Sequence, residues 1–151
     1  MRHRWTRIIV ASFLAVGAVA CGSGSNKSSS GGASESGEPG AVSITEKDFA
    51  IDESTTQASA GEVRFSIHND GPSVHEFVVI KTDLDDGELP LVADGSEVDE
   101  DQLNGIGEQE DIQANGDTTL SLTLQPGHYV LICNIPGHYT QGMHASFTVT
   151  G

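Results

Sequence analysis

Cys133, His138 and Met143 stand at five-residue intervals near the C-terminus of the chain. A thiolate, an imidazole and a thioether from one short segment form a soft to borderline ligand set. Such a set suits a metal that cycles between Cu(I) and Cu(II), whereas structural zinc prefers a closed tetrahedron of thiolates and imidazoles. The spacing therefore predicts three ligands of one copper ion.

A trigonal copper site needs a second imidazole, and His75 is placed to supply it. His75 follows a turn signal at residues 69–73 and opens the apolar run 75–80. Two His, one Cys and a distant Met are the ligands of a copper site that transfers single electrons. We therefore expect His75 to lie beside Cys133 in the folded chain.

The other histidines compete unequally for the metal. His68 and His128 alternate out of phase with the inward-facing positions of their strands, so they should point away from the core. His144 adjoins Met143, and a neutral imidazole binds copper more strongly than a thioether does. Adjacent residues in an extended segment point to opposite sides, so only one of this pair can face the copper. Met143 is the preferred ligand and His144 the alternative.

The N-terminus has the pattern of an export signal. Arg2, Arg4 and Arg7 precede the apolar stretch 8–20, which is too short to be a good bilayer span and ends in small residues. We expect residues 1–20 to be a signal peptide that is removed.

Cys21 directly follows the expected cleavage site. Residues 19–22 resemble the lipobox of bacterial lipoproteins, with Ala18 where leucine is more common, and ordinary secretion could use the same site. Residues 22–40 are mostly Gly, Ser and short polar residues, which suits a flexible tether. We expect Cys21 to be lipidated and the protein to be anchored at the outer face of the cell membrane. Cys133 is then the single free thiol of an exported protein.

Residues 41–151 are enough for one domain with its own core. The chain has 22 acidic residues against seven Lys and Arg, a formal charge of −15, and removal of the signal takes three arginines away. Nucleic acid is an unsuitable partner for so acidic a surface. Nine of the acids lie in residues 83–101, without the register of a calcium-binding loop. A solvated acidic insert is preferred there over a specific docking face.

The domain is patterned as β-structure throughout. Apolar and polar residues alternate at 63–68, 119–124 and 146–150, and turn signals separate these runs. The insert alone suggests a helical turn, at 89–93 or 98–103. Seven or eight short strands predict an all-β, two-sheet Greek-key sandwich, with the strands at 42–45, 49–51, 63–67, 75–81, 111–113, 119–124, 128–133 and 146–150.

These motifs resemble the cupredoxins, the small type 1 blue copper proteins of the plastocyanin, azurin and auracyanin type. The resemblance rests on the turn before His75, on Pro126-Gly127-x-Tyr129, and on the Cys133, His138 and Met143 spacing with a closing apolar strand. It implies that His75, Cys133 and His138 are equatorial ligands and that Met143 is axial. The long acidic insert and Glu76 depart from the best-known members.

The resemblance also suggests how the sulfur is tuned. A backbone N–H two residues after the cysteine can donate to the thiolate, and Ile135 leaves that donor available because the proline comes one residue later. A second N–H is expected from the turn near Asn69. Both would draw charge from the sulfur and favour Cu(I). The imidazole of His138 should reach the surface as the electron port.

The leading functional hypothesis is a monomeric one-electron carrier between redox proteins that dock near His138. The alternative is a lipoprotein that delivers copper to an oxidase, although the chain lacks the Met and His clusters typical of such proteins. An enzyme is disfavoured, because multicopper enzymes place histidines beside the blue-copper cysteine. Here its neighbours are Ile132 and Asn134.

Overall fold

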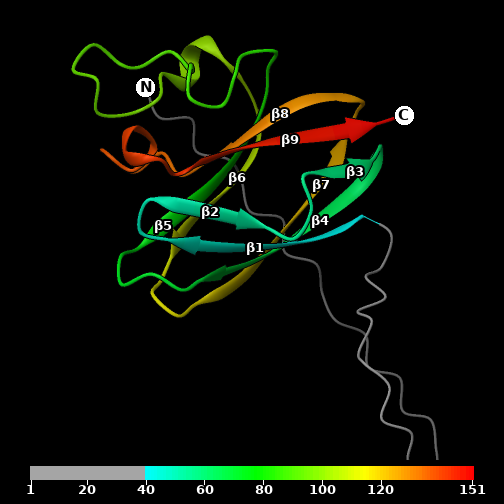
Figure 1. Ribbon diagram of the computed structural model, residues 1–151, viewed down its shortest axis with the longest axis horizontal. Coiled ribbons are helices and arrows are strands. Elements are labelled where there is room, and N and C mark those ends of the chain that lie inside the picture. The colour runs from blue at the N-terminus through cyan, green and yellow to red at the C-terminus, as the bar shows by residue number, and fades with distance from the viewer. Residues whose placement is uncertain (1–39) are drawn as a thin grey trace, which may run out of the picture. The chain divides into compact units, whose positions relative to one another are not determined.

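The computed structural model describes residues 40–151, so the expected signal peptide, Cys21 and nearly all of the linker lie outside the described residues. The described chain forms nine strands and two short 3₁₀ turns, with no α-helix among these residues (Figure 1). The strands are β1 (Ala41–Lys47), β2 (Ala50–Glu53), β3 (Gln57–Ser59), β4 (Gly61–Asn69), β5 (His75–Lys81), β6 (Asn104–Ile112), β7 (Asp117–Leu124), β8 (Gly127–Ile132) and β9 (His144–Thr150). The 3₁₀ turns are η1 (Glu100–Gln102) and η2 (Tyr139–Gln141).

Two mixed sheets form a sandwich (Figure 1). One has the order β2-β1-β4-β7 and the other the order β3-β9-β8-β5-β6. The β1–β4 and β3–β9 pairs are parallel, and the remaining pairs are antiparallel. The predicted all-β sandwich is confirmed, with nine strands among the described residues where seven or eight were expected.

The differences from the prediction lie in edge strands. β3 has three residues and was not predicted, and β6 begins at Asn104 where only 111–113 was expected. The sequence of β6 contains two glycines and three acids and does not alternate regularly. Its conformation depends on pairing with β5, with irregular register near Phe77 and Ile80. The residues of such short edge strands show little of the apolar and polar alternation from which a strand is predicted.

The main core lies between the sheets and follows the predicted alternation. Phe65, Phe77, Phe147 and Tyr129 are among its largest buried side chains, and the phenylalanine rings contact one another. Leu131 and Cys133 lie in the same cluster as Tyr129. The inward face of β8 therefore carries the Cys133 side chain into the core.

A second apolar cluster covers the outer face of the five-stranded sheet. Leu89 and Val98 from the insert pack with Tyr139 against Val130 and Ile132. The insert thus adds a third layer, and both faces of β8 are buried. Of the two helical segments considered there, residues 98–103 contain the turn η1. No helix among residues 40–151 has the length and apolarity needed to span a membrane.

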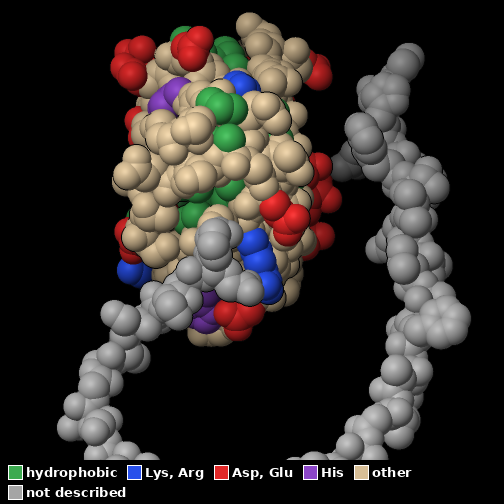
Figure 2. Space-filling view, turned by 90° about the vertical axis from the view of Figure 1, so that its right-hand side faces the viewer, with side chains coloured by type: hydrophobic (Ala, Val, Ile, Leu, Met, Phe, Trp, Pro, Cys, Tyr) green, Lys and Arg blue, Asp and Glu red, His purple; other side chains and the backbone are tan. Residues whose placement is uncertain are grey.

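Acidic side chains are not confined to the insert. Figure 2 shows the end of the sandwich opposite the loop that follows β8, where acidic groups lie around the margins and hydrophobic side chains appear only in small groups. Acidic residues therefore also occur outside the insert, as at Glu62, Glu108 and Asp117.

One acidic side chain is buried in the core. Glu46 continues the inward face of β1 after Val42 and Ile44, is fully buried, and has no hydrogen-bond partner for either carboxyl oxygen. Burial raises the pKa of Glu46 from 4.5 to about 8, and the nearby Glu76 carboxyl adds to the rise. The Glu46 side chain is therefore protonated in the folded protein at neutral pH.

Glu46 should make the free energy of unfolding depend on pH. Its folded pKa lies above its unfolded pKa, so between pH 4.5 and about 8 the unfolded state loses a proton that the folded state keeps. Stability should fall across this window by about 1.4 kcal/mol per pH unit at most. Glu46→Gln should match the wild type near pH 4.5 and gain relative stability up to pH 8. Urea unfolding of the metal-free protein measures this, with the exposed Glu62→Gln as control, and parallel pH profiles for the wild type and Glu46→Gln would contradict it.

Candidate metal centre

The pairing of β5 with β8 brings His75 and Cys133 together. Val78 pairs with Ile132 in an antiparallel ladder, so the start of β5 and the end of β8 lie at the same end of the sheet. His75 opens β5, and Cys133 directly follows β8. The loop from Cys133 to β9, called the ligand loop below, then returns His138 to the same place.

Three ligand atoms form a nearly regular triangle. Nδ1 of His75 lies 3.3 Å from Nδ1 of His138, and Sγ of Cys133 lies 3.4 Å from Nδ1 of His138 and 3.9 Å from Nδ1 of His75. A point about 2.1 Å from all three atoms exists within this triangle, which matches metal–N and metal–S bonds of roughly 2.0–2.3 Å. The donor set therefore fits one ion in a trigonal plane.

Most of this cluster is closed to solvent. His75, Cys133 and Met143 are fully buried, whereas His138 is partly exposed. Burial and the neighbouring His138 imidazole lower the pKa of His75, and the Asp48 carboxylate opposes them. The interior thus favours the neutral imidazole, which is the form that binds a metal.

Met143 and His144 point to different environments. Met143 belongs to the main core with Cys133, and its carbonyl accepts a hydrogen bond from the Cys133 N–H at 3.1 Å. Nδ1 of His144 lies 3.5 Å from Asp86 Oδ2, and its ring lies 5.1 Å from the Tyr139 ring. The insert therefore holds His144 away from the cluster, and Met143 is the residue left facing the interior.

Two backbone N–H groups act on the Cys133 sulfur. The N–H of Glu76 donates to Sγ at 3.5 Å, and the N–H of Ile135 also lowers the pKa of the thiol. Burial outweighs them and raises the pKa of Cys133 to about 11, with the Glu46 and Glu76 carboxyls adding to the rise. A bound cation is needed to offset this cost of forming the thiolate.

The prediction that the turn near Asn69 supplies a hydrogen-bond donor to the Cys133 sulfur is wrong. Asn69 is fully buried and uses its side-chain amide to hold the turn, donating to the carbonyls of Ser73 and Ile112 at 2.8 Å and accepting from the Gly71 N–H. It thereby positions the start of β5. The second donor is instead Glu76, because the residue after His75 lies directly beside the sulfur on the neighbouring strand.

The acidic insert fastens the ligand loop from outside. The Asn134 side chain exchanges hydrogen bonds with the backbone of Val98 and also donates to Glu100. The Gly137 N–H donates to the Ser96 carbonyl at 2.7 Å. The Tyr139 hydroxyl bridges the insert, accepting from Leu89 N–H and donating to the Asp86 carbonyl. Sequence analysis did not anticipate this role, because the buried Leu89 and Val98 are isolated among nine acids.

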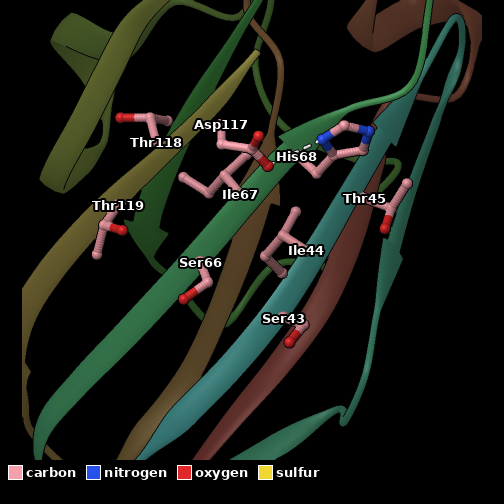
Figure 3. Close-up of a pocket in the computed structure, with 9 residues that line it drawn as sticks. All are labelled: Ser43, Ile44, Thr45, Ser66, Ile67, His68, Asp117, Thr118 and Thr119. Atoms are coloured by element: carbon pink, nitrogen blue, oxygen red, sulfur yellow. Dashed lines mark hydrogen bonds and ion pairs between the residues drawn. The ribbon is translucent and has the colours of Figure 1, made fainter. Parts of the chain in front are cut away.

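The other two histidines among residues 40–151, His68 and His128, make contacts outside the cluster. His128 contacts the Thr82 carbonyl through Nδ1 at 2.8 Å, and His68 pairs with Asp117 at 2.9 Å. His68 and Asp117 line a cavity of about 330 Å³ on the four-stranded sheet. Figure 3 shows these two side chains among short hydroxyl side chains of β1, β4 and β7. This cavity is separate from the metal cluster, since its residues belong to the opposite sheet.

Comparison with known proteins agrees with this arrangement. Residues 39–150 match the family of copper binding proteins that contains plastocyanin and azurin. The chain belongs to this family. No match was found among curated proteins.

The solved structures that resemble this cupredoxin share its fold. Auracyanin from Roseiflexus castenholzii is 24% identical with a TM-score of 0.59, covering 76% of this chain and all of its own. Auracyanin A from Chloroflexus aurantiacus is 23% identical, with a TM-score of 0.51 and coverage of 74% and 100%. An azurin from Methylomonas sp. strain J is 19% identical, with a TM-score of 0.52 and coverage of 74% and 98%. Copper, the predicted cofactor, is confirmed by the family, and the four predicted residues are arranged as a type 1 copper site.

The contact between the insert and the ligand loop can be tested with Tyr139→Phe. This change leaves the buried Leu89 N–H without an acceptor, which should reduce the free energy of unfolding by about 1–3 kcal/mol. Hydrogen exchange should also become faster in residues 84–103. Tyr129→Phe is a matched control, because the Tyr129 hydroxyl likewise bridges the N–H and carbonyl of Gln125, far from the insert. Equal exchange rates in the insert of both variants would contradict the bridging role.

Proposed function

We propose that this cupredoxin is a type 1 copper protein that carries single electrons between redox partners outside the cytoplasm. His75, Cys133 and His138 would hold the copper ion, and Met143 would be a fourth, weaker donor. The observation that carries the proposal is the triangle formed by two Nδ1 atoms and one Sγ atom. Two of the three residues, His75 and Cys133, are buried, and His138 reaches the surface.

The copper supplies reversible exchange between Cu(I) and Cu(II). The residues of this chain set the conditions for that exchange. The Cys133 thiolate accepts charge-withdrawing hydrogen bonds from two backbone N–H groups, which favours the reduced state. The core excludes water from His75, Cys133 and Met143. Because the strands and the insert hold the ligand residues, their positions should change little when copper changes between Cu(I) and Cu(II).

Electrons would enter and leave through His138. The ring of Phe49, which is 41% exposed, meets the His138 imidazole edge to face at a centroid distance of 5.8 Å. Val74 beside His75 is also exposed, as is Pro136 in the ligand loop. A redox protein could therefore approach an apolar surface around one imidazole, within the acidic field of the domain.

Two other functions fit the structure less well. A copper-delivery protein must release its metal, but here the thiol and one imidazole are fully buried beneath a fastened loop. A multicopper enzyme needs a second set of ligands close to the first. Among residues 40–151, His75, Cys133 and His138 form a single group of this kind.

We further propose that the protein is exported and anchored through a lipid on Cys21. The support is the sequence of residues 1–22 together with the Gly and Ser-rich segment that precedes β1 at Ala41. A tether of this composition would let the copper domain reach partners near the membrane surface.

The copper function is tested by Cys133→Ser. The copper-loaded wild type should have the intense blue absorption and narrow copper hyperfine splitting of a thiolate site. A hydroxyl cannot supply the same charge-transfer transition, so Cys133→Ser should lose the blue band completely while keeping its β-sheet circular dichroism. His144→Ala is the control and should stay blue. A colourless wild type with bound Cu(II) would overturn the proposal, and a blue Cys133→Ser would overturn the ligand assignment.

The anchor is tested by cell fractionation. Wild-type protein should partition into membranes or detergent, and Cys21→Ser should be released or remain unprocessed. Cys133→Ser keeps Cys21 and should fractionate as the wild type does. Mass spectrometry that finds an unmodified mature N-terminus at Cys21 would rule out the lipid.

A further inference from the structure

One two-residue turn touches both histidines of the metal cluster. Lys47 pairs with Ala50 in the β1–β2 hairpin, so Asp48 and Phe49 alone form its tip. Asp48 contacts the His75 ring, and Phe49 contacts the His138 ring. Phe49 has a φ of 69°, a left-handed conformation that a bulky residue rarely adopts. The hairpin keeps this unfavourable geometry where it meets the metal cluster.

The contact between Asp48 and His75 is buried and isolated. Oδ1 of Asp48 lies 3.2 Å from Nε2 of His75, within ion-pair distance, and neither of these buried atoms has a hydrogen-bond partner. The Ser73 hydroxyl donates to Oδ2 of the same carboxylate at 3.0 Å, which orients it. Nε2 is the second ring nitrogen of His75, and the first, Nδ1, points at Cys133 and His138. The carboxylate and the metal position therefore lie on opposite sides of one imidazole.

Gly71 leaves the space that this contact requires. A Cβ at position 71 would lie 2.8 Å from Oδ1 of Asp48 and 2.9 Å from Nε2 of His75. Both atoms are themselves buried, although the Asp48 side chain is 29% exposed. A side chain at Gly71 would therefore push the carboxylate and the ring apart.

We propose that Asp48 is a positioning residue for the copper ligand His75, an inference that rests on the proposed copper function. Its carboxylate faces Nε2 and stabilises the tautomer that carries the proton on this nitrogen, which leaves the Nδ1 lone pair free for the metal and restricts the plane of the ring. Its negative charge lies one imidazole away from the metal and favours Cu(II) over Cu(I). Asp48 thus opposes the backbone N–H groups on Cys133, which favour Cu(I).

The first test uses the metal-free full-length protein and does not depend on copper. Nitrogen-15 chemical shifts of the histidine rings should show the His75 proton on Nε2. Asp48→Asn keeps an acceptor oxygen and should keep this tautomer, whereas Asp48→Ala should give a mixture of tautomers. A proton on Nδ1 in the wild type, or an unchanged tautomer in Asp48→Ala, would overturn the positioning role.

The second test measures the reduction potential of the copper-loaded protein by voltammetry. Asp48→Asn should stay blue and shift the affinity ratio toward Cu(I) by about tenfold, which corresponds to about 59 mV for one electron. Asp52→Asn is the matched control, since it removes the same charge from an exposed position in the same hairpin. Equal potentials in the two variants would overturn the electrostatic part of the inference.

Gly71→Ala tests the same contact without removing the carboxylate. The added methyl should separate Asp48 from His75, so this variant should show the mixed tautomers of Asp48→Ala. A wild-type tautomer in Gly71→Ala would count against the inference. A wild type that binds copper without a blue band would instead overturn the proposed function, and the tautomer result would still stand.

Discussion

The antiparallel pairing of β5 with β8 is the constraint on which the metal centre depends. It places the first residue of one strand beside the residue that follows the other, so that His75 and Cys133 meet at one end of the sheet. A shift of one residue in this register would turn one of them to the other face. The same pairing aims the Glu76 N–H at the sulfur, so ligand placement and sulfur tuning share one cause.

The third layer extends this constraint to the ligand loop. The loop has backbone hydrogen bonds of its own, and the insert adds contacts from outside through Ser96, Val98 and the Leu89 N–H, which bond to Gly137, Asn134 and the Tyr139 hydroxyl. The acids of the insert remain in solvent while Leu89 and Val98 enter the apolar cluster on the outer face of the sheet. The insert is therefore both an acidic surface and a structural support. Its contact with His144 also separates that ring from the metal position.

The interior combines opposing electrostatic effects around one thiol. Burial and the Glu46 and Glu76 carboxyls disfavour a thiolate, whereas two backbone N–H groups favour it. The Asp48 carboxylate stands behind His75. A cation at the centre of the triangle would compensate the buried thiolate and attract the carboxylates. The burial of a polar cluster in this core is consistent with binding a metal.

The sequence by itself determined the chemistry of the centre and the class of the fold. Residue type decides metal preference, so the thiolate, imidazole and thioether of the ligand loop indicated copper before any contact was known. Alternation with period two identified most strands, since each has one face in the core. His75 could be predicted as a ligand because it follows a turn and is the first residue of an apolar run.

Only the tertiary structure decided what depends on neighbours distant in sequence. The edge strand β3 and the first part of β6 exist because partner strands pair with them, and their own residues carry little signal. The second N–H donor on the sulfur, the contacts of the insert and the carboxylate behind His75 all join segments separated by 27 to 57 positions. Their geometry follows from strand register and packing. Residue types and their spacing in the sequence indicate which ligands are available, whereas the fold determines which other groups surround these ligands.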